Sequence, residues 1–588
     1  MTFDQLSLKL NKIEKTSARL EMTQQLAQLL VSLDEAEIKP TLYLLQGRLT
    51  PLYQSLDFNL SEKMVVRALA KLIIRHKPKA TEEVTNLFGQ VDDATIVKQV
   101  QQEYKQLGDL GLLAETIITR LNLSSKKLSI VKVYQHLKTI AQISGVGSQE
   151  RKLQLLVDLL SQVSPLAGRY IVRIVLGKMR LGFGLMTLLD ALSWAKVGDK
   201  TQAKLLESYY QRQADIGKLA QVYLKDGLVG LQTAYDVQVG VPVAPELCQR
   251  LNTAKEIIEK MGQVIAEPKY DGLRAQLHFN KEEKVVKVFT RSLEDVTEMF
   301  PEAKKALKFI QVKSCILDAE VVGVDPTTGK ILPFQETMKR KRKYDVAQLA
   351  KELPVRFYVF DILDINDRPL IDIPLLKRKT YLEKAFAKNP ILEKTPYRLI
   401  DDPEKLHQFH QDMLSQGYEG VVVKHPQAKY RAGRKGWRWV KIKEAEGTSG
   451  KLKDTLDLVV MGYYLGKGKR AQFGLGAILV GIMGYNEEIL SIAKIGTGMT
   501  EKQLVELKQK LDQLKVSQKP KEYHEVDKQL LPDVWVEPKL VVEVAADEIT
   551  KSPVHAAKVA LRFPRLVRLR DDKSWEDITS INELKSLQ

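Results

Sequence analysis

Apolar residues recur at helical spacing through the first third of the chain. Leu153, Leu156, Val157 and Leu160, for example, fall at positions i, i+3, i+4 and i+7, which places them on one face of an amphipathic helix. Stretches of this kind follow one another with few interruptions. We therefore predict an all-α region over residues 1–235.

The pattern changes after a proline-punctuated connection at residues 241–245. Short β-branched runs then mix with helical stretches, which predicts an α+β domain over residues 236–445. Beyond a small polar linker, short apolar strands alternate with glycine-rich turns, with one helical interlude near residues 500–516. This arrangement is typical of a small β-barrel of the oligonucleotide-binding (OB) type, which we place at residues 446–588.

Composition and charge narrow the class of protein. A chain of 588 residues exceeds what one hydrophobic core serves, so several domains are expected. The net charge of +18 suits a polyanionic partner, nucleic acid first and an anionic membrane second. The two cysteines, Cys248 and Cys315, exclude a four-cysteine zinc site and suggest no disulfide framework. With no secretory signal and no apolar run of the ~20 residues that a membrane helix needs, we expect a soluble, cytoplasmic protein without membrane partners.

A candidate nucleophile lies in the stretch at residues 267–274. An apolar run precedes this stretch and a strand-like alternation follows it, so Glu267 and Lys269 should project from one face of a strand end. The step Asp271-Gly272 predicts a tight turn. A lysine held among charges at a strand end is a candidate nucleophile, because its pKa responds to burial and to neighbouring cations. The alternative is an ordinary hairpin with a surface lysine.

Charged or aromatic residues mark several other predicted strands. Taken singly, each has a simpler explanation as an exposed strand face, a core phenylalanine or a salt-bridged carboxylate. Together they supply carboxylates for a hard divalent cation, an aromatic face for a base and cations for phosphates. Nucleotidyl transfer requires this combination, because its developing charge sits on phosphate oxygens. The set comprises Arg291, Asp318, Glu320, Phe360, Glu419, Lys441 and Lys443.

A second group of basic residues lies in the helical region. Arg169 and Arg173 are spaced i, i+4 on one predicted helix, and a glycine-containing loop follows at residues 182–184. Such residues could grip phosphates together with free backbone N–H groups at a helix start. Solvated arginines beside a helix–turn–helix connection explain the same pattern equally well.

The order of motifs resembles a known superfamily. K-Y-D-G-L-R at residues 269–274 is followed by D-A-E at 318–320, Y-V-F-D at 358–361, E-G-V-V-V-K at 419–424 and W-V-K-I-K at 439–443. This series resembles the covalent nucleotidyltransferases, which include ATP-dependent DNA ligases, RNA ligases and mRNA capping enzymes. The closer resemblance is to archaeal-type, three-domain ATP-dependent DNA ligases. It is carried by the runs at residues 333–336, 534–539, 546–550, 561–565 and 570–573, and by the helical region around residues 144–192.

The resemblance implies a fold and a reaction. It implies an all-α DNA-binding domain, an α+β nucleotidyltransferase (adenylation) domain and a C-terminal OB-fold barrel. Lys269 would attack the α-phosphate of ATP and carry AMP as a phosphoramidate. AMP would then pass to the 5′-phosphate of a nick in duplex DNA, and the 3′-hydroxyl would displace it and seal the strand.

The resemblance also assigns roles to the other residues. Glu267 would contact the adenine, Phe360 would stack on it, and Arg274 would lie near the ribose. Arg291 would grip phosphate or the 5′ end of the nick. Glu320 and Glu419 would contact the metal and the sugar. Lys441 and Lys443 would neutralise the α-phosphate. Arg570 and Lys573 on the barrel would orient the pyrophosphate.

Two positions depart from the family pattern. Ala319 lies where the family often has glycine, a mild change. Lys435 occupies the position at which a nucleotide-binding arginine is expected, because the chain reads Arg434-Lys435-Gly436 where the family commonly reads Lys-Arg-Gly. Lysine keeps the charge but loses the two-pronged geometry of guanidinium. Whether Lys435 or Arg434 makes the contact is left open.

The expected partners follow from this assignment. We expect a monomer that acts on nicked double-stranded DNA, uses ATP and Mg²⁺, with Mn²⁺ as an alternative ion, and associates with the nucleoid by function; a sliding clamp is a further candidate partner. An RNA ligase or capping enzyme on the same core, or a non-catalytic nucleic-acid clamp, remains an alternative. An NAD-dependent ligase is disfavoured, since its four-cysteine zinc module cannot be built here. The residues do not choose between replication, repair and recombination.

Overall fold

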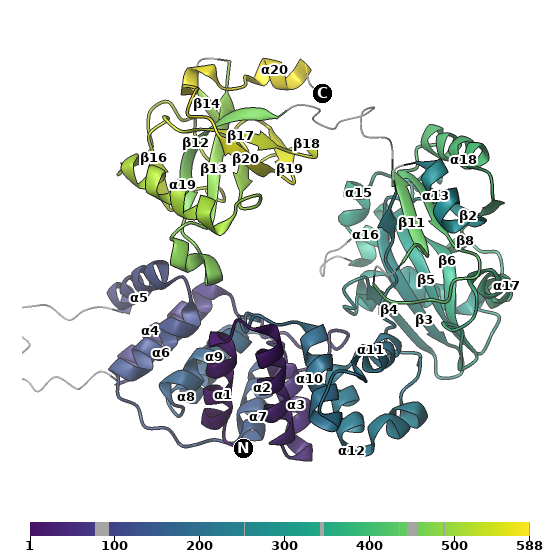
Figure 1. Ribbon diagram of the computed structural model, residues 1–588, viewed down its shortest axis with the longest axis horizontal. Helices are drawn as coiled ribbons and strands as arrows, with labels where there is room; N and C mark the ends of the chain where they lie inside the picture. Colours follow the sequence, from purple (N-terminus) through teal and green to yellow (C-terminus); the bar gives the residue numbers. More distant parts are fainter. Residues whose placement is uncertain are drawn as a thin grey trace, which may run out of the picture. The chain divides into compact units, whose positions relative to one another are not determined.

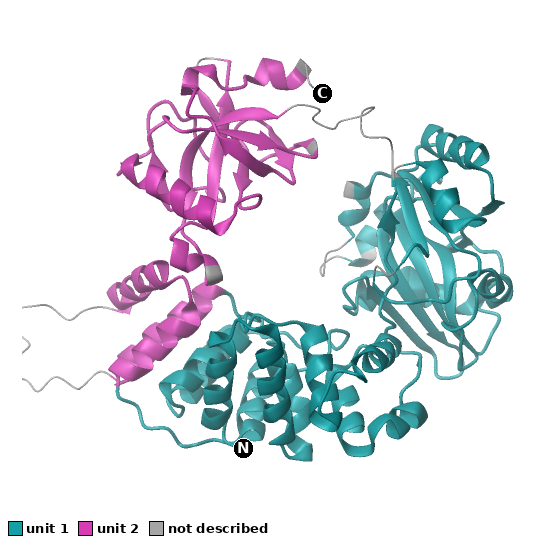
Figure 2. Ribbon diagram, in the orientation of Figure 1, with its two compact units in different colours: residues 1–61, 122–444 teal, residues 62–121, 445–588 magenta. Residues whose placement is uncertain are grey.

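The computed structural model describes residues 1–76, 93–251, 253–340, 346–433, 436–443, 455–485 and 488–586. The chain forms two compact units (Figure 2). The first contains residues 1–61 and 122–444, and the second contains residues 62–121 and 445–588.

The first unit begins with a helical part. α10 packs on α2, and α12 packs on α3. Ser164 caps the start of α9, where its side chain accepts a hydrogen bond from the Ala167 N–H and Pro165 occupies the first turn, as expected for an N-terminal cap. The hydroxyl of Tyr43 donates to Asp215 at 2.7 Å and ties α3 to α12. The helices of this part are α1 (Phe3–Lys15), α2 (Arg19–Val31), α3 (Glu35–Leu45), α7 (Ile130–Gln142), α8 (Ser148–Leu160), α9 (Pro165–Val175), α10 (Leu185–Val197), α11 (Ala203–Arg212) and α12 (Ile216–Ala234).

Two β-sheets follow in the same unit. The first sheet has the strand order β1-β11-β10-β2-β9, and α13 (Ala254–Met261) and α18 (Pro403–Ser415) pack together on it (Figure 1). The second sheet has the order β4-β3-β5-β6-β7, with β8 beside β6. Around it lie α14 (Pro301–Ala306), α15 (Phe334–Met338), α16 (Val346–Glu352) and α17 (Leu375–Ala385). The strands are β1 (Gln249–Arg250), β2 (Val264–Pro268), β3 (Leu273–Asn280), β4 (Val285–Thr290), β5 (Ser314–Gly323), β6 (Val355–Ile365), β7 (Arg368–Pro369), β8 (Leu392–Lys394), β9 (Arg398–Ile400), β10 (Gly420–Lys424) and β11 (Trp439–Lys443).

Alternation along these strands separates a hydrophobic face from a polar one. On the second sheet, Ala275, Leu277, Leu317, Ala319 and Val321 are buried in one hydrophobic cluster. The intervening residues of β3 and β5 point to the opposite face, because successive side chains of a strand alternate. The polar residues of these strands are therefore collected on the face away from that core.

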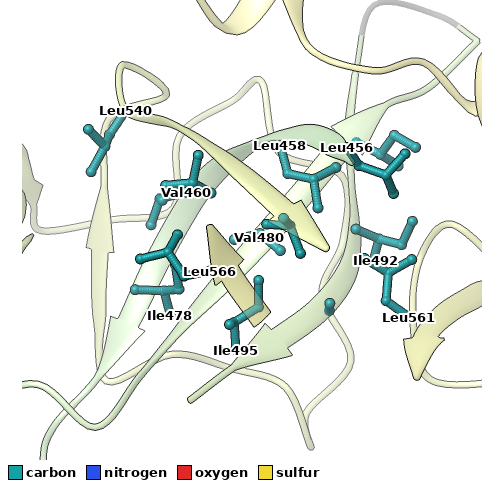
Figure 3. Packing of buried hydrophobic residues seen from close by; sticks show 14 of the residues in the cluster. Leu456, Leu458, Val460, Ile478, Val480, Ile492, Ile495, Leu540, Leu561 and Leu566 are labelled. Atoms are coloured by element: carbon teal, nitrogen blue, oxygen red, sulfur yellow. The ribbon is translucent and has the colours of Figure 1, made fainter. Parts of the chain in front are cut away.

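The second unit contains a barrel and several helices. β12 pairs with β13, β16 and β17, and β17 pairs with β20. Leu456, Leu458 and Val460 of β12 pack with Ile478 and Val480 of β13 in the barrel core (Figure 3). The strands are β12 (Leu456–Tyr464), β13 (Ala477–Met483), β14 (Ile489–Ile495), β15 (Lys515–Val516), β16 (Val534–Val536), β17 (Val541–Ala545), β18 (Glu548–Lys551), β19 (Val559–Arg562) and β20 (Arg565–Leu569). The helices are α4 (Glu62–His76), α5 (Asp93–Leu107), α6 (Leu110–Arg120), α19 (Glu501–Gln513) and α20 (Ile581–Ser586).

The architecture confirms the predicted fold class: a helical N-terminal part, a central α+β part and a strand-rich C-terminal barrel. The compact units divide the chain differently from the predicted domain boundaries, since residues 62–121 group with the barrel. Those boundaries, near residues 235 and 445, stay predictions. Among the described residues, no helix combines the length and the apolar character needed to cross a membrane.

Candidate active site

A pocket of about 570 Å³ lies between the two sheets of the first unit. Its lining comes from strands of both sheets, so residues that are far apart in the sequence share one cavity. Most of the site residues predicted in this unit meet there. They are Glu267, Lys269, Arg274, Arg291, Glu320, Phe360 and Lys441.

Lys269 follows the end of β2, and backbone bonds to the neighbouring strand fix its position. Its N–H donates to the carbonyl of Gly420 at 2.9 Å, and its own carbonyl accepts from the N–H of Glu419 at 3.0 Å. The side-chain ammonium contacts the Glu419 carboxylate directly. Gly272 lets the following turn approach β5, because a Cβ there would lie 2.3 Å from the carbonyl oxygen of Val321. The predicted tight turn is thus also a steric requirement.

The inner end of the pocket contains a buried charge cluster around Glu267. Its carboxylate forms ion pairs with Lys379 of α17 and, at 2.6 Å, with Lys424 of β10. The Lys424 ammonium also lies 4.3 Å from the ring centroid of Phe360 and 4.2 Å from that of Trp439, within cation–π range. Burial lowers the pKa of Lys424, and Glu267 acts in the opposite direction. A carboxylate and an ammonium therefore lie side by side next to an aromatic face.

Arg274 is held mainly by other protein groups. It donates to both carboxylate oxygens of Asp318, at 3.0 and 2.6 Å, to the Tyr430 hydroxyl at 3.1 Å and to the carbonyl of Glu246. Burial alone would lower the pKa of Arg274, but neighbouring groups, Asp318 foremost and Tyr430 next, together outweigh it and raise the pKa well above its ordinary value. Arg274 is therefore a fixed positive charge beside the pocket, and its geometry is set before any ligand arrives.

Glu320 lies opposite Arg274 on the neighbouring strand β5. Burial raises the pKa of Glu320 to about 7, while the positive charges of Lys269 and Arg274 act in the opposite direction. Near neutral pH this carboxyl is therefore balanced between its protonated and ionised forms. A positive charge added at the pocket would favour the ionised form.

The carboxylates of the site suit a hard cation that is shared with a substrate. Among the residues that the structure describes, no group of three or more His, Cys, Asp or Glu side chains could hold a metal by itself. Mg²⁺ does not need one, because it is commonly bound through one or two carboxylates together with substrate phosphates. Glu320 and Glu419, both adjacent to Lys269, fit that mode.

Other predicted residues lie outside the pocket or outside the described part of the chain. Lys435 is not among the described residues. The backbone of Lys443 pairs with Gly420 in the first sheet, but its side chain lies outside the described part. Arg570 and Lys573 belong to the second unit, where both contact Asp457.

The two arginines of α9 point into the helical part. Arg173 is 3% exposed and its side chain lies 2.8 Å from the Glu14 carboxylate. Arg169 donates to Asn11 at 3.2 Å and lies 3.7 Å from Glu14. These positions do not favour the predicted contact of Arg173 with DNA, which stays a prediction.

Several residues of the site were not predicted from the sequence. Lys424 and Trp439 lie inside the quoted motifs, so the motifs contained a signal that could have identified them. Lys379 and Tyr430 lie in a helix and a loop outside every motif. Strict alternation along β6 would place Tyr358 on the same face as Phe360. Tyr358 instead stacks on Tyr270 at 4.2 Å between ring centroids, because the pairing of β5 and β6 shifts at residues 318–319 and leaves Phe360 as an extra residue.

The site has the features of a nucleotidyltransferase. Two sheets enclose its pocket, a lysine lies at a strand end, and carboxylates and an aromatic face lie beside cations. Comparison with known proteins specifies which kind. Three family models match: "DNA ligase N terminus" over residues 2–193, "ATP dependent DNA ligase domain" over residues 245–443 and "ATP dependent DNA ligase C terminal region" over residues 471–573. The chain belongs to the ATP-dependent DNA ligase family and is an enzyme of that family.

Individual relatives agree over nearly the whole chain. A protein named "Probable DNA ligase" from Dictyoglomus turgidum is 38% identical, with 99% of this chain and 97% of the relative covered. A protein named "DNA ligase" from Saccharolobus solfataricus is 34% identical, with 99% and 96% covered. A solved structure titled "Pmar-Lig_Pre." matches with a TM-score of 0.53 at 16% identity, covering 96% of this chain and 98% of that one, which shows likeness of fold.

Proposed function

We propose that this ligase seals nicks in duplex DNA by way of an AMP group carried on Lys269. The observation that carries the proposal is the position of Lys269 in a pocket that Phe360 and Glu320 also line. The Glu419 carboxylate contacts its ammonium. The proposal needs one chain and one nick, so the enzyme works as a monomer. Recruitment by a sliding clamp would be an addition to it.

The first step joins Lys269 to the nucleotide. The amine gives up a proton to solvent, its nitrogen forms a bond to the α-phosphorus of ATP, and the bond from that phosphorus to the leaving pyrophosphate breaks. Lys441, which lines the pocket, neutralises charge on the α-phosphate oxygens as it develops. Arg570 and Lys573 orient the pyrophosphate. AMP then passes to the 5′-phosphate of the nick, and the 3′-hydroxyl displaces it.

The buried polar groups of the pocket favour adenine over guanine as the bound base. The edge of adenine carries an amino donor next to a ring-nitrogen acceptor. Glu267 offers an acceptor next to the Lys424 donor, which matches that order, and Phe360 offers a face for stacking. Guanine presents a carbonyl acceptor next to an N–H donor, which reverses the order. A reversed edge leaves buried polar groups unpaired, and such mismatches discriminate strongly.

Divalent metal chemistry fits the same site. Glu320 and Glu419 are the residues that would hold Mg²⁺ together with the nucleotide phosphates. The ion would supply positive charge at phosphate oxygens. Binding of the ion would also favour the ionised form of Glu320, whose pKa is otherwise raised by burial.

Nicked DNA is supported by the charge and by the helical part. The net charge of +18 favours a polyanion. The loop at residues 144–148 leads into α8, and Gly145 and Gly147 adopt positive φ there with open space around them. Val146 between them is fully exposed. This surface offers backbone groups and a small apolar side chain to a DNA groove.

The proposal is tested by sealing assays with labelled nucleotide. The protein is incubated with Mg²⁺ and ATP labelled at the α-phosphate, and nicked duplex DNA is then added. We expect covalent label on the protein, its transfer to the nick and a sealed strand. Lys269→Ala should abolish the label, while Lys284→Ala, which changes an exposed turn lysine, should retain it.

Other outcomes would support the remaining candidates. Label from GTP but not from ATP would indicate capping chemistry, and sealing of nicked RNA but not of nicked DNA would indicate an RNA ligase. Absence of label with any nucleotide would contradict the proposal and leave a non-catalytic clamp.

A further inference from the structure

Arg570 and Lys573 share one carboxylate on the barrel. The Arg570 guanidinium lies 3.0 and 3.1 Å from the two oxygens of Asp457, and the Lys573 ammonium lies 2.8 Å from one of them. The other edge of Arg570 donates to both oxygens of Asp572 at 2.8 Å. The side chains of Arg570 and Lys573 remain 16% and 32% exposed. Both cations are therefore anchored and still accessible.

The anchor itself is rigid. Asp457 lies in β12, where its N–H donates to the Thr579 hydroxyl at 3.0 Å and its carbonyl accepts from the Thr579 N–H at 2.9 Å. Its side chain is 15% exposed, compared with 64% for Asp572. Asp457 thus provides a fixed reference point, whereas Asp572 lies on the surface of the turn after β20.

The sheet explains why cations gather at this point. Asp457 is paired directly opposite Glu543 of β17, and like charges opposite each other destabilise a sheet. Arg568 lies 2.5 Å from Glu543, and Arg570 and Lys573 satisfy Asp457. The carboxylates of Asp457 on β12 and Glu543 on β17 thus fix the positions of Arg568, Arg570 and Lys573.

We propose that Asp457 is a positioning residue for nucleotide activation, which fixes Arg570 and Lys573 as a two-pronged clamp for pyrophosphate. This inference rests on the proposed function. Tethering both cations to one carboxylate removes most of their rotational freedom before the phosphates arrive, and correct placement of such groups is a large part of catalytic power. Asp457 acts only where pyrophosphate takes part, which is the transfer of AMP from ATP to Lys269 and its reversal.

The test separates the steps of the reaction in the full-length protein. Asp457→Asn removes the charge and keeps the shape. Labelling of Lys269 by ATP, and loss of that label to added pyrophosphate, should both slow by on the order of tenfold, because the cations lose their common anchor. Sealing of a nick that already carries AMP on its 5′-phosphate should stay within about twofold of the unmodified protein, since no pyrophosphate takes part. Asp457→Glu, which restores the charge, should recover part of the labelling rate.

A matched control comes from the same barrel. Asp512 also holds two lysines, Lys508 and Lys515, and Asp512→Asn should leave the labelling rate unchanged. Thermal unfolding of both variants reports any loss of fold. Comparable slowing of labelling and of sealing by Asp457→Asn would show a merely structural role, and no slowing would also overturn the inference.

Two further results are informative. Faster labelling by Asp457→Asn would show that Asp457 restrains the cations instead of positioning them, which would contradict the inference. Absence of label on the unmodified protein would refute the proposed function and this inference together. A normal label on the unmodified protein with unaffected variants would refute the inference alone.

Discussion

Burial raises the pKa of the Glu320 carboxyl group, although this group has to be ionised when it binds a cation. Its pKa is raised from an ordinary 4.5 to about 7. A group with a raised pKa in the folded state contributes stability that is present below its ordinary pKa and is lost as the pH rises through the raised value. The folded protein therefore carries a cost at this residue above about pH 7.

We predict that Glu320→Gln raises the melting temperature of the nucleotide-free protein at pH 8 but not at pH 4.5. The amide cannot ionise, so the cost of burying a charge disappears. Thermal unfolding across this range measures the difference between the variant and the unmodified protein. Glu298→Gln, at a side chain that is 84% exposed, serves as the control. A difference that does not change with pH would contradict the assigned ionisation.

Individual site residues differ in how far the sequence identified them. Lys269, Glu267 and Phe360 could be predicted, because the motif order placed each at a strand end or on a strand. The partners of Glu267 could not, since Lys379 lies 112 positions away on a helix. Sequence spacing carries no information about such a contact. The position of Tyr358 could not be predicted either, because a register shift between β5 and β6, which alternation alone cannot reveal, separates Tyr358 from the pocket.

At the scale of elements, the active site depends on how closely the turn after β2 approaches β5. Gly272 is the point of contact, and β5 is paired on both sides, by β3 and β6. The Val321 carbonyl therefore has little freedom to move away. The same two neighbours hold Glu320 in register with Arg274.

We predict that Gly272→Ala slows adenylation of Lys269 by on the order of a hundredfold, because the added Cβ displaces the segment that carries the nucleophile. The rate is measured with labelled ATP in the absence of DNA. Gly184→Ala is a matched control, since a Cβ at Gly184 meets no atom within 4 Å and this step does not involve DNA. Equal rates for Gly272→Ala and the control would contradict the steric argument.

Most helices and strands could be predicted from the periodicity of apolar residues. Their grouping into compact units could not. The helix at residues 501–513 lies within the helical interlude predicted near residues 500–516, because it buries one regular face. The grouping of residues 62–121 with the barrel had no local signal. The grouping depends on contacts between segments that are distant in the sequence. Domain boundaries inferred from the hydrophobic pattern along the chain do not reveal such contacts.

At the scale of the whole molecule, the positive charge predicts how the protein meets DNA. With a net charge of +18, nick binding should weaken steeply as salt rises, because each phosphate contact releases counterions. Phosphate contacts of Arg169 and Arg173, which their spacing allows, would contribute to that dependence. The structure gives Arg173 a different expected effect, since it is buried against Glu14.

We predict that Arg173→Ala lowers the melting temperature and leaves the salt dependence of nick binding unchanged. Loss of a buried charged hydrogen bond costs about 1–3 kcal/mol, and a side chain that is 3% exposed has little surface to offer a phosphate. Binding is measured over a range of salt concentrations, with Arg120→Ala, at a side chain that is 51% exposed in the second unit, as a control for stability. A flatter salt dependence for Arg173→Ala would instead restore the predicted phosphate contact.

The central claim is that Lys269 carries AMP between ATP and the broken strand. The most direct test is to incubate the protein with ATP and Mg²⁺, digest it and locate the covalent AMP by tandem mass spectrometry. We predict a single modified peptide, with AMP on Lys269. AMP on another lysine of the pocket, such as Lys424 or Lys441, or absence of covalent AMP from a protein that seals nicks, would contradict it.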